Sequence, residues 1–195
     1  MNLLRPSLLS AAALTLSIPL LTQTAATGDS RPLRPPQYPA VCQVVTAQFD
    51  DSLRATPPAM DDTTRLQAAL TACANTGQAV ELAASGSNDA FYSGTLNVTG
   101  EAVVVDAGVT LYGNDSYPKY LLNITGTNAG VYGPGTIDGR GDLISGKPRL
   151  VEVRDIQNFT AAYITLTHAG KMHLYVEGGD GFTAWHIHIQ TPANT

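Results

Sequence analysis

The chain has 195 residues, enough for one domain, and a formal net charge of −5. It shows no run or patch of Lys and Arg residues, which argues against nucleic acid as a partner. Charged residues make up only 14% while Gly, Thr and Asn recur, a composition typical of short strands joined by tight turns.

The first 26 residues are typical of a secretory signal peptide. Arg5 supplies the positive charge, the apolar stretch 8–21 is short for a membrane span, and small residues permit cleavage near Ala26. We therefore expect a secreted protein, extracellular or periplasmic, without a membrane segment after cleavage; a membrane anchor is the alternative. Residues 27–40 hold four prolines and are expected to form an extended linker.

Cys42 and Cys73 are the two cysteines of the chain. An even count in an exported protein favours a disulfide, which would stabilise the fold by about 3–4 kcal/mol through its loop of roughly 30 residues. A catalytic thiol is the weaker alternative, because Cys73 falls in a helical pattern with no His nearby in sequence.

One helix is expected after the signal, at residues 61–73. Leu66, Ala69, Leu70 and Cys73 have helical spacing, and Asp62 is placed to cap the helix N-terminus. Asp61 and Asp62 also resemble an acid–base pair, but acidic residues at a helix start are the commoner case. Short strands should follow, at 41–49 before this helix and at 78–82, 91–98, 102–105, 109–112, 121–125 and 130–132 after it. Residues 133–141 interrupt the alternation.

Residues 150–190 contain two copies of one unit, aligned without a gap at an offset of 23 residues (150 with 173). Val153 aligns with Val176, and Phe159 with Phe182. Self-similarity at such a period is typical of a solenoid.

Each copy also alternates between apolar and polar residues, which indicates strands with one buried and one exposed face. The exposed positions should be Glu152, Tyr163, Thr165, His186, His188 and Gln190. The pattern predicts an all-β parallel β-helix with rungs of roughly 20–25 residues and a short N-terminal capping helix. A β-sandwich is the alternative, but it has no reason to repeat at a fixed offset.

Two further aromatic or metal-ligating features lie in the second copy. His186 and His188 could ligate a metal, but no third ligand has matching spacing, so no metal site is predicted. Trp185 could stack on a sugar; its parity with Ile187 instead favours an interior position.

Several segments occur in the order found in one family. They are Asp61-Asp62-Thr63, Leu66–Leu70, the Gly133-Pro-Gly-Thr-Ile-Asp-Gly-Arg-Gly141 segment, Pro148–Leu150, Gly179–Thr183 and Thr191-Pro192. This set resembles the bacterial polygalacturonases of glycoside hydrolase family 28. The resemblance implies a right-handed parallel β-helix, monomeric at full length. It also implies inverting hydrolysis of the α-1,4 bonds of pectin or polygalacturonate without a cofactor.

The catalytic motifs of that family all follow the Thr-Pro segment, and the chain ends at Thr195. Residues 41–195 are therefore interpreted as the N-terminal part of such a domain, with no catalytic residue and no expected activity, since inverting hydrolysis requires both an acid and a base. A calcium-dependent pectate lyase and a non-catalytic polysaccharide-binding β-helix are the alternatives.

Three residues are expected to contact substrate. His173, Lys171 and Tyr175 should lie on the outside of the rung beneath the missing catalytic strand, if the rung length holds. Cations recognise anionic sugars, so Lys171 and His173 are expected to pair with a galacturonate carboxylate. A solvated outer surface is the alternative for all three.

Overall fold

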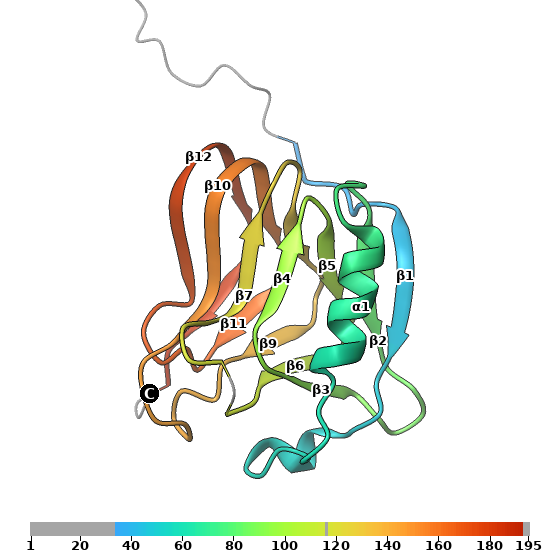
Figure 1. The fold of residues 1–195 in the computed structure, drawn as a ribbon, viewed down its shortest axis with the longest axis vertical. Coiled ribbons are helices and arrows are strands. Elements are labelled where there is room, and N and C mark those ends of the chain that lie inside the picture. Colours follow the sequence, from blue (N-terminus) through green and yellow to red (C-terminus); the bar gives the residue numbers. More distant parts are fainter. Residues whose placement is uncertain (1–33, 116, 193–195) are drawn as a thin grey trace, which may run out of the picture. The chain divides into compact units, whose positions relative to one another are not determined.

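A computed structural model describes residues 34–115 and 117–192. The strands stack into a parallel β-helix with three faces (Figure 1), and every strand pairing in these residues is parallel. The predicted fold class is therefore confirmed. The proposed signal peptide, residues 1–26, lies outside the described residues. No helix in the described ranges is long and apolar enough to cross a membrane.

The first face contains β1 (Val41–Thr46), β2 (Ala79–Ala83), β5 (Ala102–Val105), β8 (Gly130–Tyr132) and the later parts of β10 (Arg149–Ala162) and β12 (Leu174–Trp185). The second face contains β3 (Ala90–Ser93), β6 (Thr110–Gly113), β9 (Thr136–Asp138), β11 (Thr165–Thr167) and β13 (His188–Gln190). The third face contains β4 (Leu96–Thr99), β7 (Tyr120–Thr125) and the earlier parts of β10 and β12.

The register of the last rungs confirms the sequence repeat. Val153 pairs with Val176 and Phe159 with Phe182, both at an offset of 23 residues. Earlier rungs are longer, since Leu96 pairs with Leu122 and Leu122 with Val151. The variation lies in the loops, so a strict period appears only where the loops are short.

The two longest strands turn a corner of the helix. Within β10, Asp155 and Asn158 have positive φ values of 46° and 61°, which bend the strand from the third face to the first. In β12 the corner contains Gly179, where φ is +116° and a Cβ would lie 2.4 Å from the Ile156 carbonyl oxygen. The Gly-Asp-Gly segment is thus required by the turn.

The interior is filled by the apolar residues that the alternation predicts. Val151, Val153, Ile164 and Leu166 are buried in one cluster that runs through the coils. Phe159 stacks on Phe182 at 5.6 Å between ring centroids. Burial of such stacked apolar side chains is the main favourable contribution to the stability of the fold.

A short helix and a disulfide cover one end of this core. The helix α1 (Thr63–Cys73) buries Leu66, Ala69, Leu70 and Cys73, and it packs beside β1, β2 and β4 (Figure 1). The predicted disulfide between Cys42 and Cys73 is present, with an S–S distance of 2.05 Å. It fastens β1 to the covering helix.

The predicted side-chain cap from Asp62 is wrong. The Asp62 carboxylate instead accepts hydrogen bonds from the Tyr92 backbone N–H, at 2.8 Å, and from Arg65. Asp61 accepts the bond from the Thr63 N–H at 2.9 Å. Neither aspartate is free for acid–base chemistry, because the pair fastens the start of α1 to β3.

Three details of the predicted strands also differ. Residues 91–98 form two strands, β3 and β4, around a corner, and β9 lies within the 133–141 segment that seemed to break the pattern. Trp185 packs on the outer side of the first face with Ala162 and Tyr163, whereas Ile187 packs on the interior. His186 has φ of +48° between them, so parity is not preserved across this corner.

Candidate functional site: a basic groove on the third face

A groove of about 380 Å³ lies on the outer side of the third face. We call it the basic groove, and it is lined by Pro118, Lys119, Tyr120, Lys147, Arg149, Glu152, Arg154 and Lys171. Five of these residues are cationic and one is acidic. All three lysines of the chain are among them, although the chain as a whole carries a net charge of −5. The expectation that the protein has no basic patch is therefore wrong.

The β-helix brings these cations together from separate coils. The Arg149 N–H donates to the Lys119 carbonyl oxygen at 2.7 Å, and the Lys171 N–H donates to the Pro148 carbonyl oxygen at 3.1 Å. Segments far apart in the sequence thus run side by side at the edge of the groove. The positive charge is a product of stacking and not of a basic run in the sequence.

Glu152 is buried at the base of the groove, which contradicts its predicted exposed position. Its carboxylate accepts hydrogen bonds from both Arg149 and Arg154, and the two guanidinium groups shield it from water. Burial acts to raise the pKa of Glu152, but the hydrogen bonds from Arg149 and then Arg154 outweigh it and hold the pKa below its usual value. Glu152 is thus an ionised anchor for two arginines.

The two arginines have further partners that restrict their movement. The Arg149 guanidinium lies over the ring of Tyr175, 3.9 Å from its centroid, and Arg154 Nη2 lies 3.4 Å from Glu177 Oε2. By contrast, the lysines at 119, 147 and 171 are exposed and form no ion pair with any residue in 34–115 or 117–192. The groove therefore combines two held guanidinium groups with three mobile ammonium groups.

The structure separates the three residues that the sequence predicts to contact substrate. Lys171 lines the groove, and Tyr175 supports Arg149 from beneath it. His173 does not line the groove; its Nε2 lies 3.5 Å from the Ala169 N–H. Burial lowers the pKa of His173, more than the hydrogen bond with the Gln190 backbone raises it, which favours the neutral imidazole. Arg149, Arg154, Lys119 and Lys147 were not predicted, because nothing in their spacing indicates that they meet.

A second polar cluster lies by the second face around Asp138 of the Gly-rich segment. Asp138, Asp142 and His168 place oxygen or nitrogen atoms within 4.8 Å of one another, as a metal site would. However, Arg54 Nε lies 2.8 Å from Asp138 Oδ2 and Arg54 Nη2 lies 2.8 Å from Asp142 Oδ1. The hydrogen bond from Arg54 also holds the pKa of Asp142 below its usual value. A cation would have to displace this guanidinium, so the residues fit a structural ion-pair cluster better than a metal site.

The remaining candidate residues, His186 and His188, are exposed as predicted. The His186 ring lies 5.5 Å from Trp185 and 6.1 Å from Tyr163. They join no metal-binding group among the described residues.

Comparison with known proteins gives sequence relatives and structural neighbours. The chain is 31% identical to an endo-polygalacturonase of Pectobacterium carotovorum subsp. carotovorum, over 90% of this chain and 51% of that protein. A polygalacturonase of Ralstonia solanacearum is 28% identical, over 97% of this chain and 47% of that protein. No family model matches the chain.

The solved structures agree with the sequence relatives. A polygalacturonase from Erwinia carotovora ssp. carotovora has a TM-score of 0.70 and 29% identity, over 86% of this chain and 54% of that chain. A putative glycosyl hydrolase from Parabacteroides merdae has a TM-score of 0.62 at 14% identity, which supports the fold alone. The chain spans about half the length of the curated relatives it matches.

Proposed function

Because the chain is a homologue of bacterial polygalacturonases over about half of their length, we propose that it is a polygalacturonase-like glycoside hydrolase component. In this proposal the basic groove binds the galacturonate units of pectin. The observation that carries the proposal is the concentration of five cationic side chains in one groove of an acidic protein.

The arrangement of these cations suits a polymer with one carboxylate on each sugar. Arg149 and Arg154 are positioned by Glu152, so little conformational entropy is lost when a guanidinium group binds a carboxylate. Charge-assisted hydrogen bonds of this kind are roughly twice as strong as neutral ones. The three exposed lysines can then adjust to successive carboxylates along the polymer.

We assign the groove to binding and not to bond cleavage. Inverting hydrolysis needs an acid and a base separated by roughly 6.5–9.5 Å, so that a water molecule fits between base and sugar. Glu152 is the only lining residue with a carboxyl group, and two arginines hold it ionised and buried. Hydrolysis of the α-1,4 bonds, with inversion and without a cofactor, is proposed for residues outside this groove.

The same proposal places the protein in an exported compartment. The Cys42–Cys73 disulfide supports this, since such bonds persist in oxidising compartments. We propose that the protein is secreted, extracellular or periplasmic, where pectin is accessible to it.

The test measures binding of an oligogalacturonate by calorimetry, with release of reducing ends assayed in parallel. We expect binding that weakens steeply between low and high salt, and that is lost for the fully methyl-esterified oligomer. Acetylation of amino groups neutralises all three lysines and should weaken binding by about tenfold or more. Substitution Lys171→Gln should weaken it and Lys171→Arg should not.

The outcomes also separate the alternatives. Binding without any release of reducing ends supports a binding role for this chain, and release abolished by a calcium chelator would support a lyase instead. Equal affinity for the charged and the esterified oligomer would remove the groove from the proposal.

A further inference from the structure

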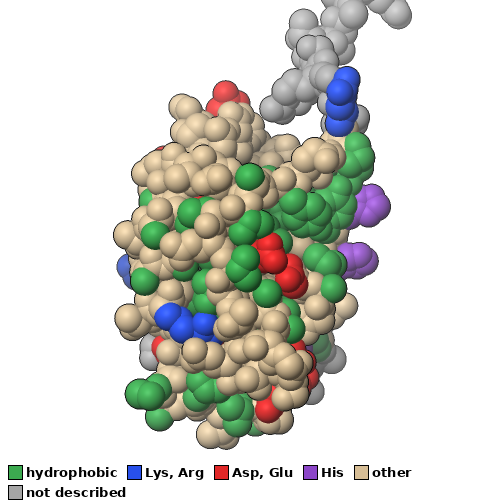
Figure 2. All heavy atoms as spheres, turned by 90° about the vertical axis from the view of Figure 1, so that its right-hand side faces the viewer, with side chains coloured by type: hydrophobic (Ala, Val, Ile, Leu, Met, Phe, Trp, Pro, Cys, Tyr) green, Lys and Arg blue, Asp and Glu red, His purple; other side chains and the backbone are tan. Residues whose placement is uncertain are grey.

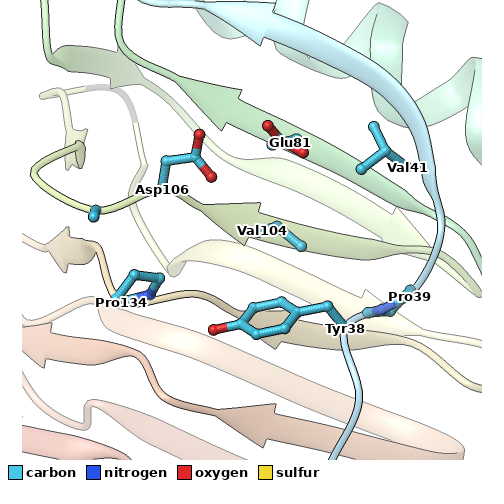
Figure 3. A pocket seen from close by; sticks show the side chains of 8 residues that line it. Tyr38, Pro39, Val41, Glu81, Val104, Asp106 and Pro134 are labelled. Carbon is cyan, nitrogen blue, oxygen red and sulfur yellow. The ribbon is translucent and has the colours of Figure 1, made fainter.

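A second cavity, of about 460 Å³, lies on the outer side of the first face (Figure 3). We call it the acidic pocket; its lining includes Tyr38, Val41, Glu81, Val104, Asp106 and Pro134. Its size falls within the range of small-ligand sites, roughly 300–1,000 Å³. On the side of the molecule shown in Figure 2, acidic side chains lie among hydrophobic ones. Nothing in the proposed function uses this cavity.

Two carboxyl groups face the pocket from neighbouring coils. Glu81 on β2 and Asp106 after β5 are linked by a side-chain hydrogen bond, above a floor that includes Val104 (Figure 3). Burial, and then the charge of Asp106, raise the pKa of Glu81. A hydrogen-bonded pair leaves no room for a water molecule between the two groups, so it does not have the geometry of an inverting glycosidase. It does offer several hydrogen-bonding oxygens on one wall.

A tyrosine forms the opposite wall, and the fold holds it in place. The ring of Tyr38 stacks on Tyr163 at 5.6 Å and contacts Tyr132 at 6.0 Å. The Tyr163 hydroxyl donates to the Pro36 carbonyl oxygen at 3.2 Å, which fastens the segment before β1 to the first face. Tyr38 still has 48% of its surface exposed, so one part of the ring is available to a ligand.

The aromatic surface continues away from the pocket along the first face. Tyr132, Ala162 and Trp185 occupy successive coils in register on its outer side. The result is a pocket with hydrogen-bond acceptors at one end of an aromatic strip. Aromatic rings that stack on the apolar face of a pyranose ring, beside acceptors for its hydroxyl groups, are a favourable arrangement for a sugar.

We propose that the acidic pocket and the strip beside it bind an uncharged glycosyl unit of a polysaccharide. Its hydroxyl groups would donate to Glu81 and Asp106 while its ring packs on Tyr38. An anionic sugar is disfavoured by repulsion from the two carboxyl groups. A calcium ion is also disfavoured, since it takes six to eight oxygen ligands and the pocket supplies two carboxyl groups.

The pocket and the basic groove would thus divide the ligand between two faces. Neutral units would bind the first face, and charged units the third. The inference rests on the proposed function for the class of ligand, a polysaccharide, but it does not depend on binding in the groove.

The test compares a neutral galacto-oligosaccharide with an oligogalacturonate of equal length, using calorimetry and NMR with the purified protein. We expect the neutral oligomer to bind wild type and to shift resonances of Tyr38 and Val104. Tyr38→Ala and Asp106→Asn should each weaken its binding about tenfold, and Tyr38→Phe, which keeps the ring, should not. None of the three should change binding of oligogalacturonate.

Three outcomes would overturn the inference. They are no binding of the neutral oligomer by wild type, unchanged binding by Tyr38→Ala, and calcium binding that Asp106→Asn abolishes. Because Tyr38 is half exposed, its variants should fold, and circular dichroism with thermal unfolding checks this. Loss of oligogalacturonate binding by groove variants alone would bear on the proposed function and leave this inference intact.

Discussion

The basic groove and the acidic pocket are built from the same coils yet have opposite chemistry. In the groove, a single buried carboxylate is surrounded by cations; in the pocket, two carboxyl groups are linked above an apolar floor and faced by an aromatic ring. The interior stacking is alike beneath both, because inward positions carry the apolar residues. The outward positions of a β-helix can therefore vary independently on each face without disturbing the core.

The largest expected effect separates the two sites through the disulfide. Replacing Cys42 and Cys73 by Ser should lower the free energy of unfolding by about 3–4 kcal/mol, because the bond closes a loop of roughly 30 residues. Val41, next to Cys42, lines the acidic pocket, so binding of the neutral oligomer should weaken as well. Urea unfolding and calorimetry measure the two effects. Equal weakening of oligogalacturonate binding would show that the two sites are not independent.

The next effect tests the buried carboxylate of the groove. Glu152→Gln should lower the free energy of unfolding by about 3 kcal/mol, since it leaves two neighbouring guanidinium groups without their shared counter-charge. Glu177→Gln is the matched control: Glu177 is exposed and has one longer contact with Arg154, so its loss should cost less than about 0.5 kcal/mol. Similar losses in urea unfolding would contradict the role assigned to Glu152.

The two sites should also respond differently to pH. The pKa of Glu152 is lowered, so its contribution to stability is present above the pKa of the unfolded chain, about 4.3, and is lost as pH falls through the folded value. The pKa of Glu81 is raised, so its protonation occurs at higher pH and stabilises the folded state as pH falls. NMR titration of the glutamate carboxyl carbons measures both. The reverse order of titration would contradict this account.

The smallest expected effect concerns the segment that carries Tyr38. Tyr163→Phe removes the hydrogen bond to the Pro36 carbonyl oxygen and should lower the free energy of unfolding by about 0.5–1.5 kcal/mol. The stacking on Tyr38 is retained, so neutral oligomer binding should fall only slightly. Tyr175→Phe, on the opposite site, is the control for loss of a tyrosine hydroxyl. Thermal unfolding and limited proteolysis before β1 provide the measurements, and an unchanged unfolding temperature would count against this contact.

Much of the fold was predictable because it depends on local patterns. The 23-residue repeat, the apolar alternation of Val151 and Val153, and the helical spacing of Leu66 and Leu70 all reflect which side chains must be buried. The predictions failed at the corners. A positive φ at His186 reverses the side of the sheet on which Trp185 lies, and a local pattern does not report such a turn.

The site was far less predictable than the fold. Lys171 was correctly expected near a binding surface, but its neighbours Lys119, Lys147 and Arg149 come from other loops and strands. Glu152 was expected to be exposed because its position in the strand points outward. It is buried because two arginines fold over it, and that depends on partners three residues before and two residues after it.

The order of residues along the chain was sufficient to establish a coiled β architecture, a covering helix and its disulfide, since these follow from periodicity and from cysteine count. The charge of each face, and therefore the ligand that each face favours, emerged only when the coils stacked. Electrostatic and aromatic sites depend on distances between side chains on different coils, and loops of unequal length determine which side chains meet.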